Sequence, residues 1–461
     1  MCELPQDLYD EVISYLRNDT PSLEACSLAN RSMTIPCQKL LFQCIELLGG
    51  QGDKRGNTSY NFHQLLAGSP HIAGYVQSLH IRDTEFKQRE PILLDPSVFT
   101  TEQNLPYEDY VLRNGDDLVL DGPVVPYEDT NKRRLWLPED KFLPLVTPLL
   151  HNLNALAITY RERWSKLSLR VLISLLHLMQ LPSLHYLRLC LRCFPSDLAL
   201  GGNVKHLIVD HTGMFEDLPV RCLHPPSAPI YLDSFSIRGR ANPIRWTQFP
   251  TPRIQLSRLR KLVFRGYDYN DHASFGRLLQ SCSSLEDFEI FPGDGQSIGP
   301  PLNPLMPILF LLAVMETVNL PSANTGRLEG LIDLGKLVSL RRFAVSTWVS
   351  INKDGNVVTP FLWLSKILQG AYSTQTLKEL SIRVEYYCSP GEVDIRIWKD
   401  VFDILLDDRF NLKTFNIAIS GPYATAYEAV EELMYCDDLR ELGCRLGKPL
   451  SFYIDQDGFE F

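Results

Sequence analysis

The chain has 461 residues, of which 45% are hydrophobic, and a formal net charge of −10. This length and composition predict a folded protein with a large core, either as one elongated array or as two globular domains. The negative charge argues against a general nucleic-acid-binding role, which needs clustered Lys and Arg. The longest apolar run, residues 305–315, is interrupted by Pro307 and is too short to cross a bilayer. We therefore expect no nucleic acid and no membrane among the partners.

The cysteines and the first residues bear on the compartment. Eleven cysteines, an odd number, are scattered without a regular framework, which indicates a reducing environment. The start MCELPQDLYDE has neither the basic segment nor the apolar core of a secretory signal. We expect the protein to be cytoplasmic or nuclear.

Residues 4–47 predict three short helices. In the first, Leu8, Val12 and Tyr15 with Leu16 share one face at helical spacing. The second is expected to begin with Thr20 as its N-cap and Pro21 at its first helical position. The third is expected to begin between residues 31 and 36 and to continue through residue 45. So small a unit covers its apolar side chains incompletely, which favours a partner-binding face.

The same segment resembles an F-box of the form common in fungal proteins. The matching residues are Leu4-Pro5, Leu8, Glu11-Val12, Leu16, Cys26-Ser27-Leu28, Arg31-Ser32 and Leu41-Phe42. Met33 stands where many members of that family have Trp. The resemblance implies a domain at residues 1–47 that binds a Skp-type adaptor and, through it, a cullin. The implied adaptor-binding residues are Leu4, Pro5, Leu8, Val12, Leu16 and Leu28. The alternative is a helical cap that only packs on the next domain.

An acidic, Pro-rich stretch follows. Residues 83–129 contain twelve Asp and Glu against three Lys and Arg, so nearly all of the excess negative charge lies there. We interpret this stretch, at about 83–130, as a solvated insertion rather than a binding site.

An apolar frame, L-x2-L-x-L with variants, recurs along the rest of the chain. From Leu153 onward its intervals are 20 to 37 residues, in or near the period of leucine-rich repeats. The frames begin at Val76, Leu153, Leu184, Val204, Leu232, Leu259, Leu285, Met315, Leu340, Leu377, Leu412 and Leu439. Helical patterns precede several frames, at 169–180, 275–282, 361–370, 397–406 and 426–436.

These units of helix, turn and strand predict an α/β fold. Residues 48–460 are expected to form an irregular solenoid with a parallel sheet on its concave side, and the pattern resembles the leucine-rich repeats of F-box proteins. A doubly wound α/β enzyme is the competing architecture. It would need a glycine-rich phosphate turn after a strand, and the sequence has no G-x-G-x-x-G, P-loop or G-x-S-x-G.

One motif suggests a metal site. Cys190, Cys193, His206 and His211 have the spacing C-x2-C-x12-H-x4-H of a zinc finger. The apolar frame predicts instead that Tyr186 lies beside His206 on neighbouring strands and that Cys190 lies four residues further along. That separation is about 13 Å at about 3.3 Å per residue, too far for ligands of one zinc ion. We therefore predict no bound metal and no cofactor.

The same frame brings basic residues together on the outward face of the sheet. Arg238 and Arg265 become lateral neighbours, and Lys261, Arg342 and Arg383 share that face. These five residues could bind an acidic or phosphorylated target segment. Alternatively, they pair with internal acids such as Asp287, Glu289 and Glu379.

Together these features favour a non-enzymatic substrate receptor of an SCF-type ubiquitin ligase. The resemblance implies that the N-terminal helices bind the adaptor and the repeats bind a target protein. The alternatives are a leucine-rich-repeat interaction scaffold without a ligase role and a hydrolase on an irregular α/β fold.

Overall fold

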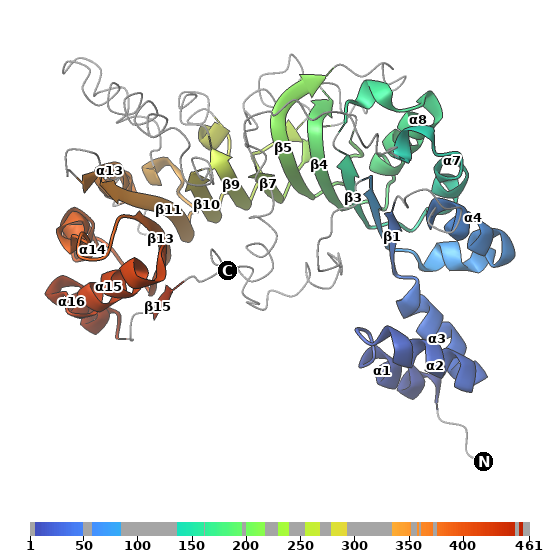
Figure 1. The fold of residues 1–461 in the computed structure, drawn as a ribbon, viewed down its shortest axis with the longest axis horizontal. Coiled ribbons are helices and arrows are strands. Elements are labelled where there is room, and N and C mark those ends of the chain that lie inside the picture. Colours follow the sequence, from blue (N-terminus) through green and yellow to red (C-terminus); the bar gives the residue numbers. More distant parts are fainter. Residues whose placement is uncertain are drawn as a thin grey trace. The chain divides into compact units, whose positions relative to one another are not determined.

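The computed structural model (Figure 1) describes residues 5–48, 58–83, 136–160, 162–195, 200–216, 229–238, 254–267, 278–292, 334–351, 357–358, 361–371, 376–447 and 451–454. The described residues form two compact units, divided between Ile230 and Tyr231. The fold is mixed α/β, and each unit contains a parallel sheet. Among the residues described, no helix has both the length and the apolarity that crossing a membrane requires.

The first unit begins with three helices: α1 (Gln6–Ser14), α2 (Thr20–Ala29) and α3 (Arg31–Leu41). Their shared core is Ile13, Leu23 and Cys37, against which Met33 and Leu16 pack from the side. A core of three fully buried side chains is small, so the stability of this helical unit depends on each of them.

Two local expectations for this segment were wrong. The N-cap of α2 is Asp19 rather than Thr20, because the Asp19 carboxylate accepts a hydrogen bond from the backbone N–H of Ser22. The third helix ends at Leu41 rather than continuing through residue 45, because residues 44–48 form strand β1 (Cys44–Leu48). Pairing with strand β2 (Ser78–Arg82) satisfies the backbone of β1 and outweighs the helix propensity of its Glu and Leu residues. The expected domain boundary at residue 47 falls within β1.

Five parallel strands follow one another in the first unit. They are β1, β2, β3 (Ala155–Tyr160), β4 (Tyr186–Pro195) and β5 (His206–Glu216), each paired with the next. The helical segments between them are α4 (Thr58–Gly68), η1 (Pro70–Tyr75), η2 (Leu137–Glu139), α7 (Leu143–Val146), η3 (Thr147–Leu149), η4 (Trp164–Lys166) and α8 (Leu169–Met179). α8 matches the helix expected at 169–180. The acidic insertion expected at about 83–130 lies outside the described residues except for Asp83.

The second unit has its own run of parallel strands. They are β7 (Ser234–Arg238), β9 (Lys261–Tyr267), β10 (Asp287–Pro292), β11 (Arg342–Ile351), β13 (Glu379–Tyr387), β14 (Thr414–Ser420) and β15 (Ser451–Ile454). The short β12 (Val357–Val358) runs antiparallel to β11, and two further short strands are β6 (Ile230–Tyr231) and β8 (Ile254–Gln255). The helical segments are η6 (Leu334–Lys336), α13 (Phe361–Gly370), η8 (Ile395–Trp398), α14 (Lys399–Leu405), α15 (Tyr423–Met434) and α16 (Asp437–Leu446).

The apolar frame predicts the strands well. Ten of the twelve frames lead to a strand that begins two residues after the first position of the frame. In β4, for example, Leu184, Leu187 and Leu189 are buried, whereas Arg188 and Cys190 are partly exposed. The frame at Met315 lies outside the described residues. Of the helix expected at 275–282, residues 278–282 are described, and residues 278–280 are helical.

The frame at Leu439 was wrongly interpreted, because it lies on helix α16. Leu439 and Leu442 are both buried there. The L-x2-L spacing of the frame also suits one face of a helix, since residues three apart are neighbours on a helix surface. Asp437 and Asp438 in the first turn favour the helix through its dipole.

Helix α15 is fixed to the end of β13 and to the segment that follows it. At Gly421, just before α15, φ is +133° and an added Cβ atom would lie 2.5 Å from the carbonyl oxygen of Tyr386. The buried hydroxyl of Thr425 donates a hydrogen bond to the carbonyl oxygen of Cys388 at 3.0 Å. The carboxylate of Glu428 accepts one from the backbone N–H of Gly391 at 2.7 Å. Only glycine fits at position 421, where the backbone approaches the carbonyl oxygen of Tyr386 so closely.

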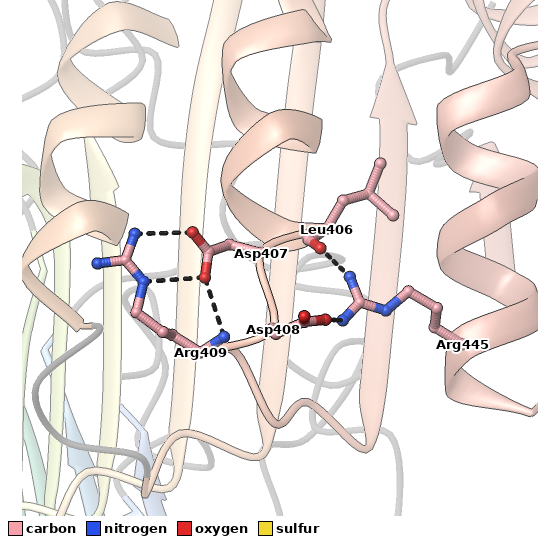
Figure 2. Close-up of polar contacts among 5 residues, drawn as sticks. All are labelled: Leu406, Asp407, Asp408, Arg409 and Arg445. Atoms are coloured by element: carbon pink, nitrogen blue, oxygen red, sulfur yellow. Dashed lines mark hydrogen bonds and ion pairs between the residues drawn. The ribbon is translucent and has the colours of Figure 1, made fainter.

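Helix α16 is held by the loop after α14 (Figure 2). The guanidinium of Arg445 donates to the carbonyl oxygen of Leu406 and, at 2.6 Å, to the carboxylate of Asp408. In the same loop, Arg409 forms a two-point contact with Asp407 at 2.7 and 2.9 Å. Hydrogen bonds from the side chain and the backbone N–H of Arg409 lower the pKa of Asp407 to about 2.

Asp83, at the end of β2, is a buried carboxyl group that is 5% exposed. One of its oxygens accepts a hydrogen bond from the backbone N–H of Leu137 at 3.0 Å. Burial raises the pKa of Asp83 to about 6, although the hydrogen bonds from the backbone of Leu137 and Trp136 oppose this shift.

We predict that Asp83→Asn stabilises the protein near pH 7. The pKa of Asp83 in the folded protein, about 6, lies above its ordinary value of 3.8, so the stability that the neutral carboxyl contributes is present below pH 3.8 and lost as the pH rises through about 6. The amide keeps an acceptor for Leu137 but cannot ionise. The free energy of unfolding should rise by about 1–3 kcal/mol at pH 7 and change little at pH 3.5.

Urea denaturation at the two pH values measures this difference. Asp407→Asn is the matched control, because the contribution of its carboxyl group to stability depends on pH in the opposite direction. Because the pKa of Asp407 is lowered, its contribution is present above pH 3.8 and lost as the pH falls through about 2. An equal effect of Asp83→Asn at both pH values would contradict the prediction.

Candidate protein-binding surfaces

The helical unit exposes several large apolar side chains. Val12 on α1 is 57% exposed and Leu28 on α2 is 89% exposed, and Leu8 and Pro5 are exposed as well. Side chains of this size are normally covered in a folded protein, and a group of them indicates a binding surface. Pro5, Leu8, Val12 and Leu28 are thus accessible to a partner.

Two of the six expected adaptor-binding residues, Leu16 and Leu4, are not among these exposed residues. Leu16 is partly buried and packs on the core of the helical unit, so its side chain serves the fold. Leu4 lies outside the described residues. Conversely, Tyr15 directly after α1 and Ile35 on α3 are exposed. Tyr15 was predicted to share the apolar face of Leu8 and Val12, although it was not among the expected adaptor-binding residues. Ile35 was not predicted.

A hydrogen bond links the start of α1 to the start of α3. The side-chain amide of Gln6 donates to the carbonyl oxygen of Ser32 at 3.2 Å. The first turn of α1 therefore lies beside the first turn of α3. Asn30 joins α2 to α3 and caps α3 through the N–H of Ser32, so Leu28 is near the same end of the unit. We call the exposed residues Pro5, Leu8, Val12, Tyr15, Leu28 and Ile35 the helical surface.

The outward face of the second unit carries a row of alternating charge. Lys261, Asp287, Arg342 and Glu379 lie opposite one another on β9, β10, β11 and β13. The ammonium of Lys261 lies 3.2 Å from the carboxylate of Asp287 and 3.1 Å from that of Glu289. Arg342 lies 3.8 Å from Asp287. Burial raises the pKa of Asp287, and Lys261 opposes this shift.

The five residues of the expected basic patch therefore do not all share one environment. Lys261 and Arg342 have acidic partners, in agreement with the alternative drawn from the sequence. The predicted pairing of Arg238 with Arg265 is confirmed by the register of β7 and β9; their side chains lie outside what the structure describes. Arg383 is partly exposed on β13, opposite Ser346 of β11 and Ala418 of β14. Arg238, Arg265 and Arg383 form what we call the arginine row.

The first unit carries a partly buried network of charged side chains on its parallel strands. The carboxylate of Glu46 lies 2.9 Å from the guanidinium of Arg82 and 3.3 Å from the imidazole of His80. Arg188 donates twice to one carboxylate oxygen of Asp210, at 2.9 and 3.0 Å. Burial lowers the pKa of His80, although the hydrogen bond that its imidazole donates to Glu46 opposes this shift. The charges of Arg82 and Arg188 are thus balanced by the carboxylates of Glu46 and Asp210.

The residues with zinc-finger spacing lie in this region. The predicted neighbours are confirmed: Tyr186 pairs with His206, their rings stacked 4.4 Å apart, and Cys190 pairs with Asp210. His206 and Cys190 are thus four residues apart along the sheet. Within the described part of the chain, no three His, Cys, Asp or Glu side chains are grouped so that they could hold a metal ion.

Comparison with known proteins finds no protein family and no curated protein that matches this chain.

We predict that Lys261→Met destabilises the protein by about 2–4 kcal/mol, because it leaves two carboxylates close together without their shared cation. Glu289 is 4% exposed and cannot be solvated without rearrangement. Arg260→Met is the matched control, since Arg260 forms an exposed ion pair with Glu286 and its loss should cost less than about 1 kcal/mol. Urea denaturation of both variants measures the difference, and equal losses would contradict the assignment of Lys261.

Proposed function

We propose that this chain is the substrate-receptor subunit of an SCF-type ubiquitin ligase. The helical surface binds a Skp-type adaptor, and through it a cullin, while the sheet of the second unit binds a target protein. In this proposal residues 1–47 are an F-box, and the parallel strands with their preceding helices are irregular leucine-rich repeats.

The observation that carries the proposal is the exposure of the helical surface. The three helices have their own small core of Ile13, Leu23 and Cys37, yet large apolar side chains remain on the outside. Leu8, Val12 and Leu28 belong to the residues that the resemblance to the F-box implies for adaptor binding, and all three are exposed. Burying them against a partner would remove apolar area from water, which is the main driving force for such association.

The target-binding half of the proposal rests on the arginine row. The backbone register places Arg238 beside Arg265 at the strand spacing of about 4.8 Å. Two guanidinium groups at that spacing can share a carboxylate or a phosphate, which they bind through paired hydrogen bonds. An acidic or phosphorylated segment is therefore the target chemistry that this row supports.

A receptor of this kind performs no chemistry itself. Its contribution is to hold a target lysine near a separate ubiquitin-conjugating enzyme, which raises the effective concentration of the two reactants. The proposal therefore assigns no catalytic residue and no cofactor to this chain, and it places the protein in the cytoplasm or the nucleus. The second candidate function is an interaction scaffold in which the helical unit does not bind an adaptor.

We predict that Val12→Asp and Leu28→Asp each weaken binding of a purified Skp-type adaptor by at least about tenfold, because each places a charge in an apolar interface. The fold should persist, since both side chains are exposed, and circular dichroism checks this. Val338→Asp is the matched control, because Val338 is an exposed aliphatic residue of the second unit. Wild-type adaptor affinity in both folded variants would favour the scaffold function.

We predict that the double variant Arg238→Glu/Arg265→Glu loses the target but keeps the adaptor. Reversing both charges repels an anionic segment, and added salt should also weaken the wild-type target complex. Affinity purification with mass spectrometry, performed with a proteasome inhibitor, compares the co-purifying proteins of the two forms. If the double variant recovers the same proteins as the wild type, the arginine row is not the target site.

A further inference from the structure

Helix α15 exposes an apolar stripe next to its buried face. Thr425, Ala426, Ala429 and Leu433 are the buried residues of α15. Next to them around the helix, Tyr423 is 59%, Tyr427 54% and Met434 63% exposed, with Val430 partly buried between them. The rings of Tyr423 and Tyr427 lie 6.3 Å apart. We call Tyr423, Tyr427, Val430 and Met434 the α15 stripe.

The spacing of the stripe is that of a helix-pairing surface. Its members follow one another at intervals of four, three and four residues. At about 100° per residue they fall within about 60° of arc on the helix. This is the a and d pattern of a coiled coil, which forms when a second helix packs alongside. A single exposed aromatic residue would need no explanation, but four members of one heptad pattern indicate a partner helix.

An acidic residue flanks the stripe on one side. Glu431 is exposed beside the stripe, and Glu432 is exposed about 100° further round the same helix. Residues 423–438 contain five Asp and Glu and no Lys or Arg. Glu428 is engaged by the backbone of Gly391, so Glu431 is the carboxylate placed beside the apolar seam to meet a partner. In coiled coils, charges beside the apolar seam select the partner by its opposite charge.

These charges decide between the possible occupants. A second copy of this chain would bring the acidic flank of one α15 against that of the other, and like charges oppose such pairing. We propose instead that the α15 stripe is a docking site for a basic amphipathic helix of another protein, with apolar residues at heptad spacing and Lys or Arg beside them. This site is separate from the helical surface and the arginine row, and it does not rest on the proposed function.

A pair of designed peptides tests the proposal with the full chain. The probe is a fluorescent helical peptide of Leu and Lys with heptad spacing, and its counterpart has Glu in place of Lys. Fluorescence anisotropy should show binding of the Leu/Lys peptide and much weaker binding of the Leu/Glu peptide. Tyr427→Ser/Met434→Ser should weaken Leu/Lys binding by at least about tenfold. Glu431→Lys/Glu432→Lys should reverse the preference toward the Leu/Glu peptide.

The controls separate this site from the overall charge of the chain. Asp400→Lys/Asp403→Lys changes the net charge by the same amount at two exposed positions of α14 and should leave the peptide preference as in the wild type. An equal effect of this control, or unchanged binding by the Tyr427→Ser/Met434→Ser variant, would overturn the proposal. Light scattering that showed a dimer, lost in the same variant, would identify a second copy as the occupant. Adaptor binding should be unchanged in every one of these variants, so this result is independent of the proposed ligase role.

Discussion

Each of the predicted strands that the structure describes depends on burying the fourth and sixth positions of a short apolar frame, and all but β14, whose Leu412 is partly exposed, also bury the first. For β4 these positions are Leu184, Leu187 and Leu189, all of them buried. Because side chains alternate along a strand, this burial sends the intervening residues to the opposite face, and a slip of one residue would reverse the two sets. The lateral register then aligns polar residues in rows, with Tyr186 opposite His206 in one unit and Lys261 opposite Asp287 in the other.

The strands could be predicted because the frame records this burial directly in the sequence. The frame gave a wrong prediction where a helix buries the same apolar positions that a strand would bury. Leu439 and Leu442 satisfy the first two positions of the frame on a helix as well as on a strand. Strands β1 and β15 were not predicted. Residues 42–45 were assigned to the third helix, and the pairing of residues 44–48 with β2, more than thirty residues later, decides for the strand. The cap of α2 differed by one residue, since Asp19 and Thr20 are both good N-caps.

The binding surfaces were less predictable than the strands, because exposure depends on which of two apolar faces turns inward. Helix α1 has apolar side chains on two sides, and only the packed unit shows that Ile13 faces the core while Val12 faces out. The same ambiguity hid the α15 stripe, since a heptad of Tyr, Val and Met predicts a buried helix as readily as an exposed one. For charged residues the sequence indicated two kinds of partner, a target segment or internal acids, but it did not determine which of them each residue contacts. Lys261 could have faced a target, and the structure places it between Asp287 and Glu289.

The three contacts that fix α15 bear on how well its stripe could bind. The close approach of Gly421 to Tyr386, the bond from Thr425 to Cys388 and the bond from Gly391 to Glu428 hold the helix at its start and along its length. A helix fixed in this way has little conformational entropy left to lose when a partner packs against it. The ordering cost of association then falls on the partner alone, and a short peptide that is already helical in solution would gain affinity without any new contact.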